Sequence, residues 1–266
     1  MTFLKKIGLL FILVIIAASD IFFYWNSRFY DQARKQNDNQ KKIVYLEKSN
    51  KFSPLNDLVF YELGKTQLDV GLESLGNPAE AGAYFRKAVQ SLDRSIMINP
   101  SSPYAHFYLA QARLQLDFFS PSNDQRFYEE FKKAALLAGE DSHVYGEVGR
   151  LFFSRWQRLS QDDRRFTLDL LRRIIAKKDS NQITALLGIW EMNVGDYGVI
   201  DSTLPVDPQI YRIFAEFLGE KSLSLPERHK FLAGAELMEF ERARREIQAG
   251  EYALYRYQIA EARDHL

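Results

Sequence analysis

The chain has 266 residues, of which 46% are hydrophobic and 26% are charged, so it is long enough for one or two domains with a sizeable core. Lysine and arginine together number 35, as do aspartate and glutamate, and this neutral balance argues against a general nucleic-acid binder. The sequence has no cysteine, which excludes disulfides, thiol catalysis and thiolate metal sites. Glycine and proline are sparse and aromatic residues make up 14%, so we expect long helices.

The first predicted element is an apolar segment at the N-terminus. Residues 7–25 are apolar or aromatic with Ser19 and Asp20 as interruptions, and a helix of this length spans roughly 28 Å, close to the hydrocarbon core of a bilayer. Two lysines precede the run, and a Tyr-Trp pair closes it where amphipathic rings favour the membrane interface. We therefore predict a transmembrane signal-anchor helix over residues 1–26. It would hold a single-pass protein in a bacterial inner membrane, with its body on the periplasmic or extracytoplasmic side.

Two alternatives for this N-terminal segment stay open. The small residues Ala17-Ala18-Ser19 also fit the cleavage site of a signal peptide, which would be removed from the mature protein. A buried helix is the other alternative. The apolar and aromatic residues that continue past Ser19 favour the uncleaved anchor.

The next segment is polar, and the rest of the chain has the spacing of helices. Residues 27–53 predict a solvated helical or flexible stalk, because charged runs usually face water. After Pro54 the apolar residues recur at i, i+3 and i+4. Asn77-Pro78 predicts a helix start, Asn99-Pro100 predicts its end, and Pro103 suits the first turn of the following helix.

The segment around the second of these turns carries a more specific pattern. One helix closes on Asn99-Pro100, and the next carries His106 followed by Leu109-Ala110. This resembles the junction between two tetratricopeptide repeats, in which a large aromatic usually stands where His106 does. Leu63-Gly64 and Val148-Gly149 resemble the same position in two other first helices. Leu63 lies 46 residues before Leu109, and Val148 lies 39 residues after it. Both spacings exceed the family period of about 34, so longer helices must absorb the extra residues.

The resemblance implies an all-α fold in which TPR-like helical hairpins stack into an α-solenoid over residues 54–178. One hairpin cannot bury its own apolar stripe, so neighbouring hairpins must cover it, and small residues let the helices approach closely. Over residues 179–266 the pattern loosens, and we expect degenerate helical repeats or a capping bundle there. Ser180 is a predicted cap of the first of these helices.

The tripeptide Gly64-Lys65-Thr66 raises a nucleotide-binding alternative, because phosphate-binding loops end in this way. Such a loop requires a preceding strand and a glycine at the position of Val59. Val59 is β-branched, and the residues between it and Gly64 include bulky aromatic side chains that would block a tight turn around phosphate. We therefore expect these residues to lie in a packed helix.

Recognisable catalytic patterns are missing from the sequence. The four histidines, at positions 106, 143, 229 and 265, form no metal-binding pair, and no nucleophile elbow occurs. Acidic pairs such as Asp162-Asp163 fall at predicted helix starts, where they suit the helix dipole. We predict that the chain is not an enzyme and that it binds no cofactor or metal. A glycan-active enzyme is the least favoured alternative.

Two sets of residues are candidates for partner binding. The resemblance implies a concave surface that holds peptides or protein surfaces, with Tyr104, Phe107 and Arg113 as the candidate residues. Residues 150–178 carry nine basic and three acidic side chains, which predicts either a solvated face or a surface for an acidic partner. An anionic glycan or lipid headgroups would suit the same surface. The candidate residues there are Arg164, Arg165, Arg172 and Arg173.

The function predicted from these features is that of a non-enzymatic, membrane-anchored scaffold of the bacterial envelope that binds a protein partner through a TPR-like concave surface. An accessory or regulatory subunit of a membrane complex is the alternative, acting through the basic residues 150–178. Secretion, cytochrome maturation and polysaccharide export are the settings considered for it, and the sequence does not choose among them. Nucleic acid is not expected as a partner.

Overall fold

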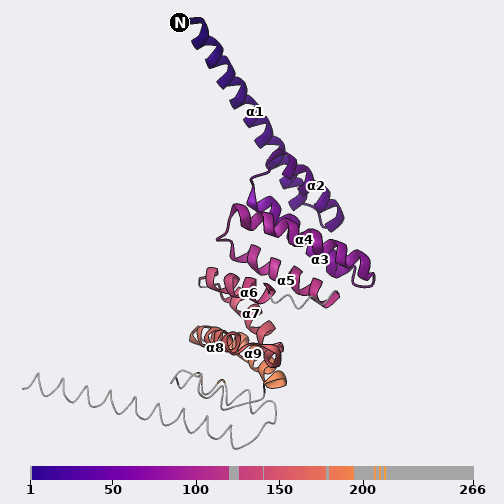
Figure 1. Ribbon diagram of the computed structural model, residues 1–266, viewed down its shortest axis with the longest axis vertical. Helices are drawn as coiled ribbons and strands as arrows, with labels where there is room; N and C mark the ends of the chain where they lie inside the picture. The colour runs from indigo at the N-terminus through magenta and orange to yellow at the C-terminus, as the bar shows by residue number, and fades with distance from the viewer. Residues whose placement is uncertain are drawn as a thin grey trace, which may run out of the picture. The chain divides into compact units, whose positions relative to one another are not determined.

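The structure is a computed structural model that describes residues 2–119, 126–139, 141–177 and 180–194, together with the single residues 207, 210 and 213. Every regular element in these ranges is a helix, so this part of the chain has the predicted all-α class (Figure 1). The elements are α1 Thr2–Arg34, α2 Asn39–Phe52, α3 Asp57–Glu73, α4 Pro78–Ile98, α5 Pro103–Phe119, α6 Arg126–Leu137, α7 Ser142–Ser154, the 3-10 helix η1 Trp156–Arg158, α8 Gln161–Ala176 and α9 Ser180–Asn193. Most of the capping bundle predicted over 179–266 lies outside the described residues.

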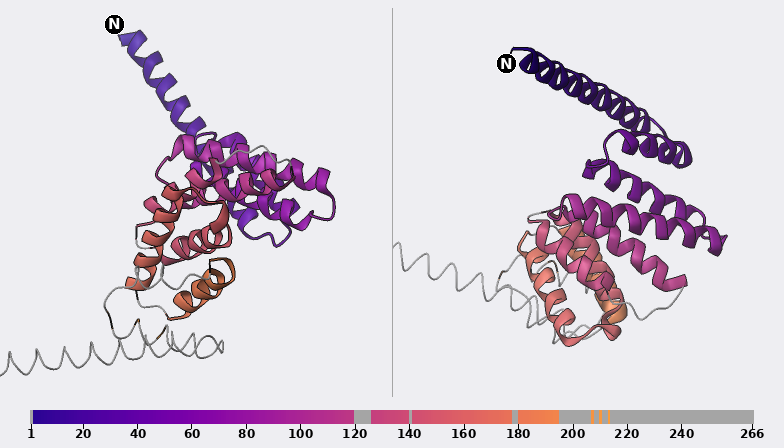
Figure 2. Two further views of the ribbon diagram at one scale, coloured as in Figure 1. Left: turned by 60° about the horizontal axis from the view of Figure 1, so that its bottom comes forward. Right: turned by 45° about the horizontal axis from the view of Figure 1, so that its top comes forward.

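Two compact units divide the chain, at residues 1–144 and 145–266. In the first unit, α1 packs on α2, α3 on α4 and α5 on α6, and each such pair also packs against the next through α2 with α3 and α4 with α5. The first helices of adjacent pairs, α3 and α5, touch as well. The stack of α3, α4 and α5 can be followed in the right view of Figure 2, where these helices are coloured purple to magenta. This succession of helical hairpins gives the first unit a TPR-like fold.

The helix ends in the first unit follow from local capping chemistry, and the predicted starts and stops are confirmed. The Asn77 side chain accepts a hydrogen bond from the backbone N–H of Glu80, and Pro78 begins α4. Helix α4 ends at Ile98, immediately before Asn99-Pro100. The Ser102 hydroxyl accepts a hydrogen bond from the backbone N–H of Ala105 at the start of α5.

The Gly-Lys-Thr tripeptide lies inside α3, as predicted, and forms no phosphate-binding loop. Gly64 is buried where α3 meets α4, and a Cβ atom added there would lie 2.5 Å from Cγ of Leu92. The hydroxyl of Thr66 donates to the carbonyl of Glu62 at 2.7 Å, which is an ordinary contact within one turn of helix. Gly64 therefore serves as a close-packing position between two helices.

The contact at Gly64 leads to a prediction with a matched control. Gly64→Ala is expected to lower the free energy of unfolding by about 1–3 kcal/mol, because the methyl group meets Leu92 and the backbone carbonyl of Ala88 at 3.2 Å. Gly82→Ala, inside α4, meets nothing nearer than an Arg86 nitrogen at 3.6 Å and should stabilise the chain by about 0.5–1 kcal/mol. Urea unfolding of the two variants measures both changes. Equal effects would contradict the close contact at Gly64.

The prediction of a transmembrane helix over residues 1–26 is wrong for the part of the chain that the structure describes, because no helix in it is long and apolar enough to cross a bilayer. Ser19 and Asp20 interrupt the apolar residues of α1. The single-pass inner-membrane localisation that was predicted from this helix is corrected with it.

Residues 27–53, predicted as a polar stalk, form the end of α1, a short turn and α2. The Asp38 carboxylate accepts hydrogen bonds from the backbone N–H groups of Gln40 and Lys41, at 2.9 and 3.2 Å, and so caps α2. Helix α2 packs on both α1 and α3. The small core between them contains Ala33, Ile43, Leu46, Val59, Leu63 and Val70. The domain boundaries at residues 26, 53 and 178 remain a prediction.

The second unit, within its described residues, contains most of α7 followed by η1, α8 and α9. Ser160 caps α8 by accepting a hydrogen bond from the backbone N–H of Asp163 at 3.1 Å. Gly149 of α7 faces Leu186 of α9, and a Cβ atom added to it would lie 3.3 Å from that side chain. Trp190 of α9 is 1% exposed and is among the largest fully buried side chains. Gly149 is therefore a close-packing position between two helices, as Gly64 is in the first unit.

Candidate functional site

The structure places the predicted residues Tyr104, Phe107 and Arg113 in three different environments on α5. Tyr104 is 36% exposed, and its hydroxyl donates to the carboxylate of Asp141. This hydrogen bond raises the pKa of Tyr104 and lowers that of Asp141. Phe107 is only 4% exposed and its ring packs edge-on against Phe131, so it belongs to the core between α5 and α6. Only Tyr104 of the three offers an open surface.

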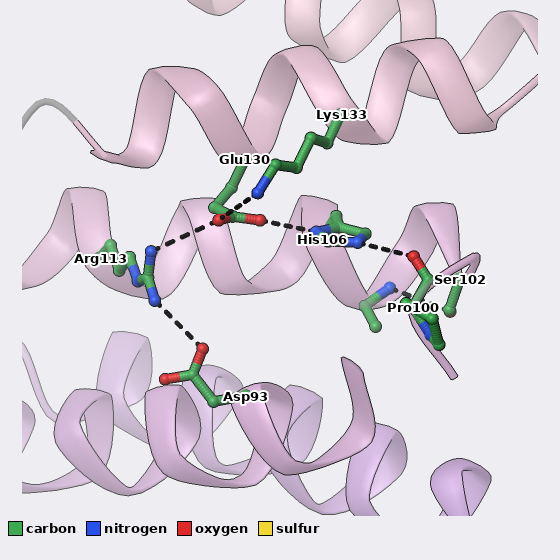
Figure 3. A network of polar contacts seen from close by, with 8 residues as sticks. Asp93, Pro100, Ser102, His106, Arg113, Glu130 and Lys133 are labelled. Carbon is green, nitrogen blue, oxygen red and sulfur yellow. Dashed lines mark hydrogen bonds and ion pairs between the residues drawn. The ribbon is translucent and has the colours of Figure 1, made fainter. Parts of the chain in front are cut away.

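Arg113 belongs to a polar network that links α4, α5 and α6 (Figure 3). Its guanidinium donates to the Asp93 carboxylate at 3.1 Å and lies 3.6 Å from the Glu130 carboxylate. Lys133 donates to the same Glu130 oxygen at 3.3 Å. Arg113 is thus engaged on both sides by carboxylates of its own chain, and its first role is to tie neighbouring helices together.

His106 completes this network from the same helix. Its Nδ1 lies 2.6 Å from a Glu130 oxygen and its Nε2 lies 3.0 Å from the carbonyl oxygen of Pro100 (Figure 3). Both partners are acceptors, so both contacts are hydrogen bonds only when both ring nitrogens carry a proton. The position where the resemblance implies a large aromatic therefore holds a buried imidazole ring that is paired with Glu130.

The two acidic members of the network respond differently to their surroundings. Burial acts to raise the pKa of Glu130, but hydrogen bonds from His106 and Lys133 outweigh it, and the net pKa lies below its ordinary value. Burial raises the pKa of Asp93, and the neighbouring Arg113 only partly offsets this. Glu130 is therefore the carboxylate that the network holds ionised, with its acceptor positions used by its own chain.

The predicted basic residues lie on α8, and Arg164 is partly enclosed there. Its Nε donates to the backbone carbonyl of Trp156 at 3.2 Å, and its guanidinium lies 5.5 Å from the centre of the Trp156 ring. This pairing of hydrogen bond and cation–π contact holds Arg164 against η1.

The other three predicted arginines are exposed, and two of them have acidic neighbours on the same helix. Arg165 lies 3.6 Å from Asp162, and Arg172 donates to Asp169 at 2.8 Å. Arg173 lies exposed in the last turn of α8, where a cation suits the helix dipole. Acidic neighbours thus compensate part of the positive charge that the sequence suggested for this segment.

The structure brings together four tyrosines that the sequence analysis did not group. They lie on the first helices of the three pairs in the first unit: Tyr30 on α1, Tyr61 on α3, and Tyr104 and Tyr108 on α5. The rings of Tyr61 and Tyr108 are 5.8 Å apart. Two charged side chains of α3, Glu62 and Lys65, lie beside them, and Asp69 follows Lys65 by one helical turn on the same stripe of α3. We call these seven residues the tyrosine face.

Two members of the tyrosine face, Tyr61 and Tyr30, have raised pKa values. Burial raises the pKa of Tyr61, and the phenols of Tyr108, Tyr104 and Tyr30 add to this effect. Burial likewise raises the pKa of Tyr30, with a further contribution from the nearby carboxylate of Glu62. Tyr30 and Tyr61 are therefore the partly desolvated members of the face, whereas Tyr104 is open to solvent.

The tyrosine face has the composition of a binding surface rather than of a catalytic centre. Tyrosine supplies a large rigid contact area with a polar tip, and it is enriched at protein interfaces. Within the described ranges, no group of three or more His, Asp or Glu side chains is arranged to hold a metal ion. The arrangement is suited to non-covalent contact with a partner.

A sequence signal for the tyrosine face existed but was incomplete. Tyr61, Lys65, Asp69 and Leu72 recur at helical spacing on α3 and are partly or fully exposed, opposite the buried stripe that contains Gly64. The sequence does not show that this stripe lies beside Tyr108, because that contact depends on how α3 and α5 pack.

Two solved structures give distant likenesses to the chain. No protein-family model matches the chain, and no curated protein matches it. Among solved structures, it is similar to a crystal structure of MamA, with 19% identity, a TM-score of 0.41 and coverage of 80% of this chain and 96% of that chain. A second crystal structure of MamA protein gives 17% identity, a TM-score of 0.37 and coverage of 85% and 94%. Both scores are low, so the residues of the chain itself decide what its surfaces are suited to bind.

Proposed function

We propose that the chain is a non-enzymatic scaffold that binds a protein partner through the tyrosine face. The observation that carries this proposal is that tyrosines from α1, α3 and α5 lie near one another, with the rings of Tyr61 and Tyr108 5.8 Å apart, and tyrosine is a side chain enriched at protein interfaces. Two contacts hold members of the tyrosine face in place before a partner arrives. Lys42 pairs with Glu62 at 3.0 Å, and the hydroxyl of Tyr104 donates a hydrogen bond to Asp141.

Site-specific photo-crosslinking in the native host tests this function. The photoreactive residue benzoyl-phenylalanine would replace Tyr104 or Tyr108 in one set of cells, and Arg86 or Gln90, which are exposed on α4, in a control set. We expect crosslinked adducts of defined mass from the two α5 positions and none from the two α4 positions. Adducts that form only from α4, or equally from all four, would contradict a partner on the tyrosine face.

The exposed basic residues of α8 are the second candidate surface, for a role as accessory subunit of a larger complex. Arg165, Arg172 and Arg173 are exposed there, while Arg164 is held against Trp156. The compensation of Arg165 and Arg172 by their own carboxylates places this surface second. Replacing these four arginines with alanine should leave the α5 crosslinks unchanged, and loss of the adducts would shift the assignment to α8.

A further inference from the structure

We propose that the tyrosine face receives a cationic side chain of the partner, lysine or arginine, at the carboxylate of Asp69, on the stripe of α3 that also carries Tyr61 and Lys65. This inference rests on the proposed function and names the chemistry of the partner.

The first observation is that Asp69 has spare acceptor capacity. It lies half-buried on α3, and within the described part of the chain no hydrogen bond or ion pair reaches its carboxylate. Burial raises the pKa of Asp69 despite the nearby lysines. A half-buried carboxylate without a direct partner gains most from a cation that comes to it.

The charged neighbours of Asp69 are mostly committed elsewhere. The groups that act on it are Lys65, Lys42, Glu73 and Glu62. Lys42 pairs with Glu62 at 3.0 Å, and Glu73 accepts a hydrogen bond from Asn39 at 2.8 Å. The carboxylates here are Asp69, Glu62 and Glu73, and the ammonium groups are Lys42 and Lys65. The surroundings of Asp69 therefore retain a negative balance, which favours a cationic partner.

Lys65 shows where an incoming cation fits. Its ammonium lies 5.3 Å from the centre of the Tyr108 ring, so this ring already receives a positive charge on its face. The ring of Tyr61, 5.8 Å from that of Tyr108, lies beside it. Lys65 lies one helical turn before Asp69 and forms no ion pair with it in the described part of the chain, so a partner's lysine or arginine would supply the direct contact that Asp69 lacks.

Other partner chemistries fit this place less well. An acidic segment would meet the carboxylates of Asp69 and Glu62, and like charges at close range are unfavourable. A purely apolar segment would cover Asp69 without pairing it, which carries the cost of an unpaired buried charge.

Binding of the full-length chain to an array of short synthetic peptides tests the proposal. The peptides would carry arginine, glutamine or glutamate at one fixed position and randomised residues elsewhere. We expect the arginine pool to bind about tenfold more tightly than the glutamine pool. Asp69→Asn should reduce this preference to about twofold or less, and Lys65→Met should increase it, because the competing ammonium is gone.

Glu47→Gln is the matched control, since it removes one negative charge from an exposed position on α2. It should leave the arginine preference unchanged, and thermal unfolding of all variants should show that each is folded. Equal binding of the three pools, or an arginine preference that survives Asp69→Asn, would overturn the cationic site while leaving the proposed function standing. Preference for the glutamate pool would also overturn it, and no binding to any pool would count against both.

Discussion

Glu130→Ala is expected to lower the free energy of unfolding by about 3–5 kcal/mol, because it leaves the buried ring of His106 and the half-buried guanidinium of Arg113 without their shared carboxylate. Glu130 holds His106 at 2.6 Å and Arg113 at 3.6 Å, and its side chain is only 11% exposed. Urea unfolding followed by far-UV circular dichroism measures the loss.

The neighbouring Glu129 provides the control for this prediction. Its side chain is 64% exposed and pairs with Lys132 at 2.6 Å on the surface of α6. Glu129→Ala should change stability by less than about 1 kcal/mol, as is usual for exposed ion pairs. Similar losses for the two variants would contradict the buried network at Glu130.

The same network predicts how stability depends on pH. The pKa of Glu130 in the folded chain lies below its ordinary value of 4.5, so its contribution is complete above that value and is lost as the pH falls through the lower folded pKa. Glu130→Gln, which cannot ionise, should therefore show a smaller loss of stability on acidification than the unmodified chain. Parallel pH profiles for the two proteins would contradict this pairing.

Phe85→Ala is expected to cost about 3–5 kcal/mol, the range for removing a large buried ring. Phe85 is fully buried in the core between α3, α4 and α5, and its ring stacks on Phe119 with centres 5.9 Å apart. The backbone of α3 comes close enough at Gly71 that an added Cβ would lie 2.5 Å from the Phe85 ring. The ring therefore fills the whole space between two helices, and little can collapse into the cavity.

A double-mutant cycle tests the contact between Phe85 and Gly71 directly. Gly71→Ala alone should destabilise the chain by about 1–3 kcal/mol through overpacking against the ring. Combined with Phe85→Leu, which makes room for the methyl group, it should cost clearly less than the sum of the two single changes. Strict additivity would show that the two residues do not share this space.

Helix boundaries were the most predictable part of the fold. The Asn-Pro turns act locally, since the amide of Asn77 caps its own helix and Pro103 stands where the missing N–H costs nothing. The role of Gly64 was also predictable, because a small residue on an apolar stripe indicates a close helix contact.

The residues of the candidate sites were less predictable, because their surroundings come from other helices. Phe107 and Tyr104 lie three positions apart on α5, yet the first is buried against α6 and the second is partly exposed. The partner of His106 is Glu130, 24 residues further along the chain, and nothing in the local sequence joins them. Tyr61 and Tyr108 meet only because α3 and α5 are first helices of adjacent pairs.

The N-terminal segment was the prediction that failed. A run of apolar residues in the sequence carries the same signal whether it crosses a bilayer or forms part of a long helix that packs elsewhere along its length. Helix α1 runs on without a break to Arg34, and Asn26 within it is buried and accepts a hydrogen bond from Ser49 of α2 at 2.6 Å. That contact ties the polar half of α1 into the first unit.

Hydrogen–deuterium exchange of the full-length chain, alone and in complex with the partner recovered by crosslinking, tests the central claim most directly. A partner on the tyrosine face is expected to slow exchange in α3 and α5, around Tyr61, Asp69 and Tyr108, and to leave the exposed side of α4 around Arg86 unchanged. Protection confined to α4, or to α8 with its arginines, would contradict a partner held on the tyrosine face.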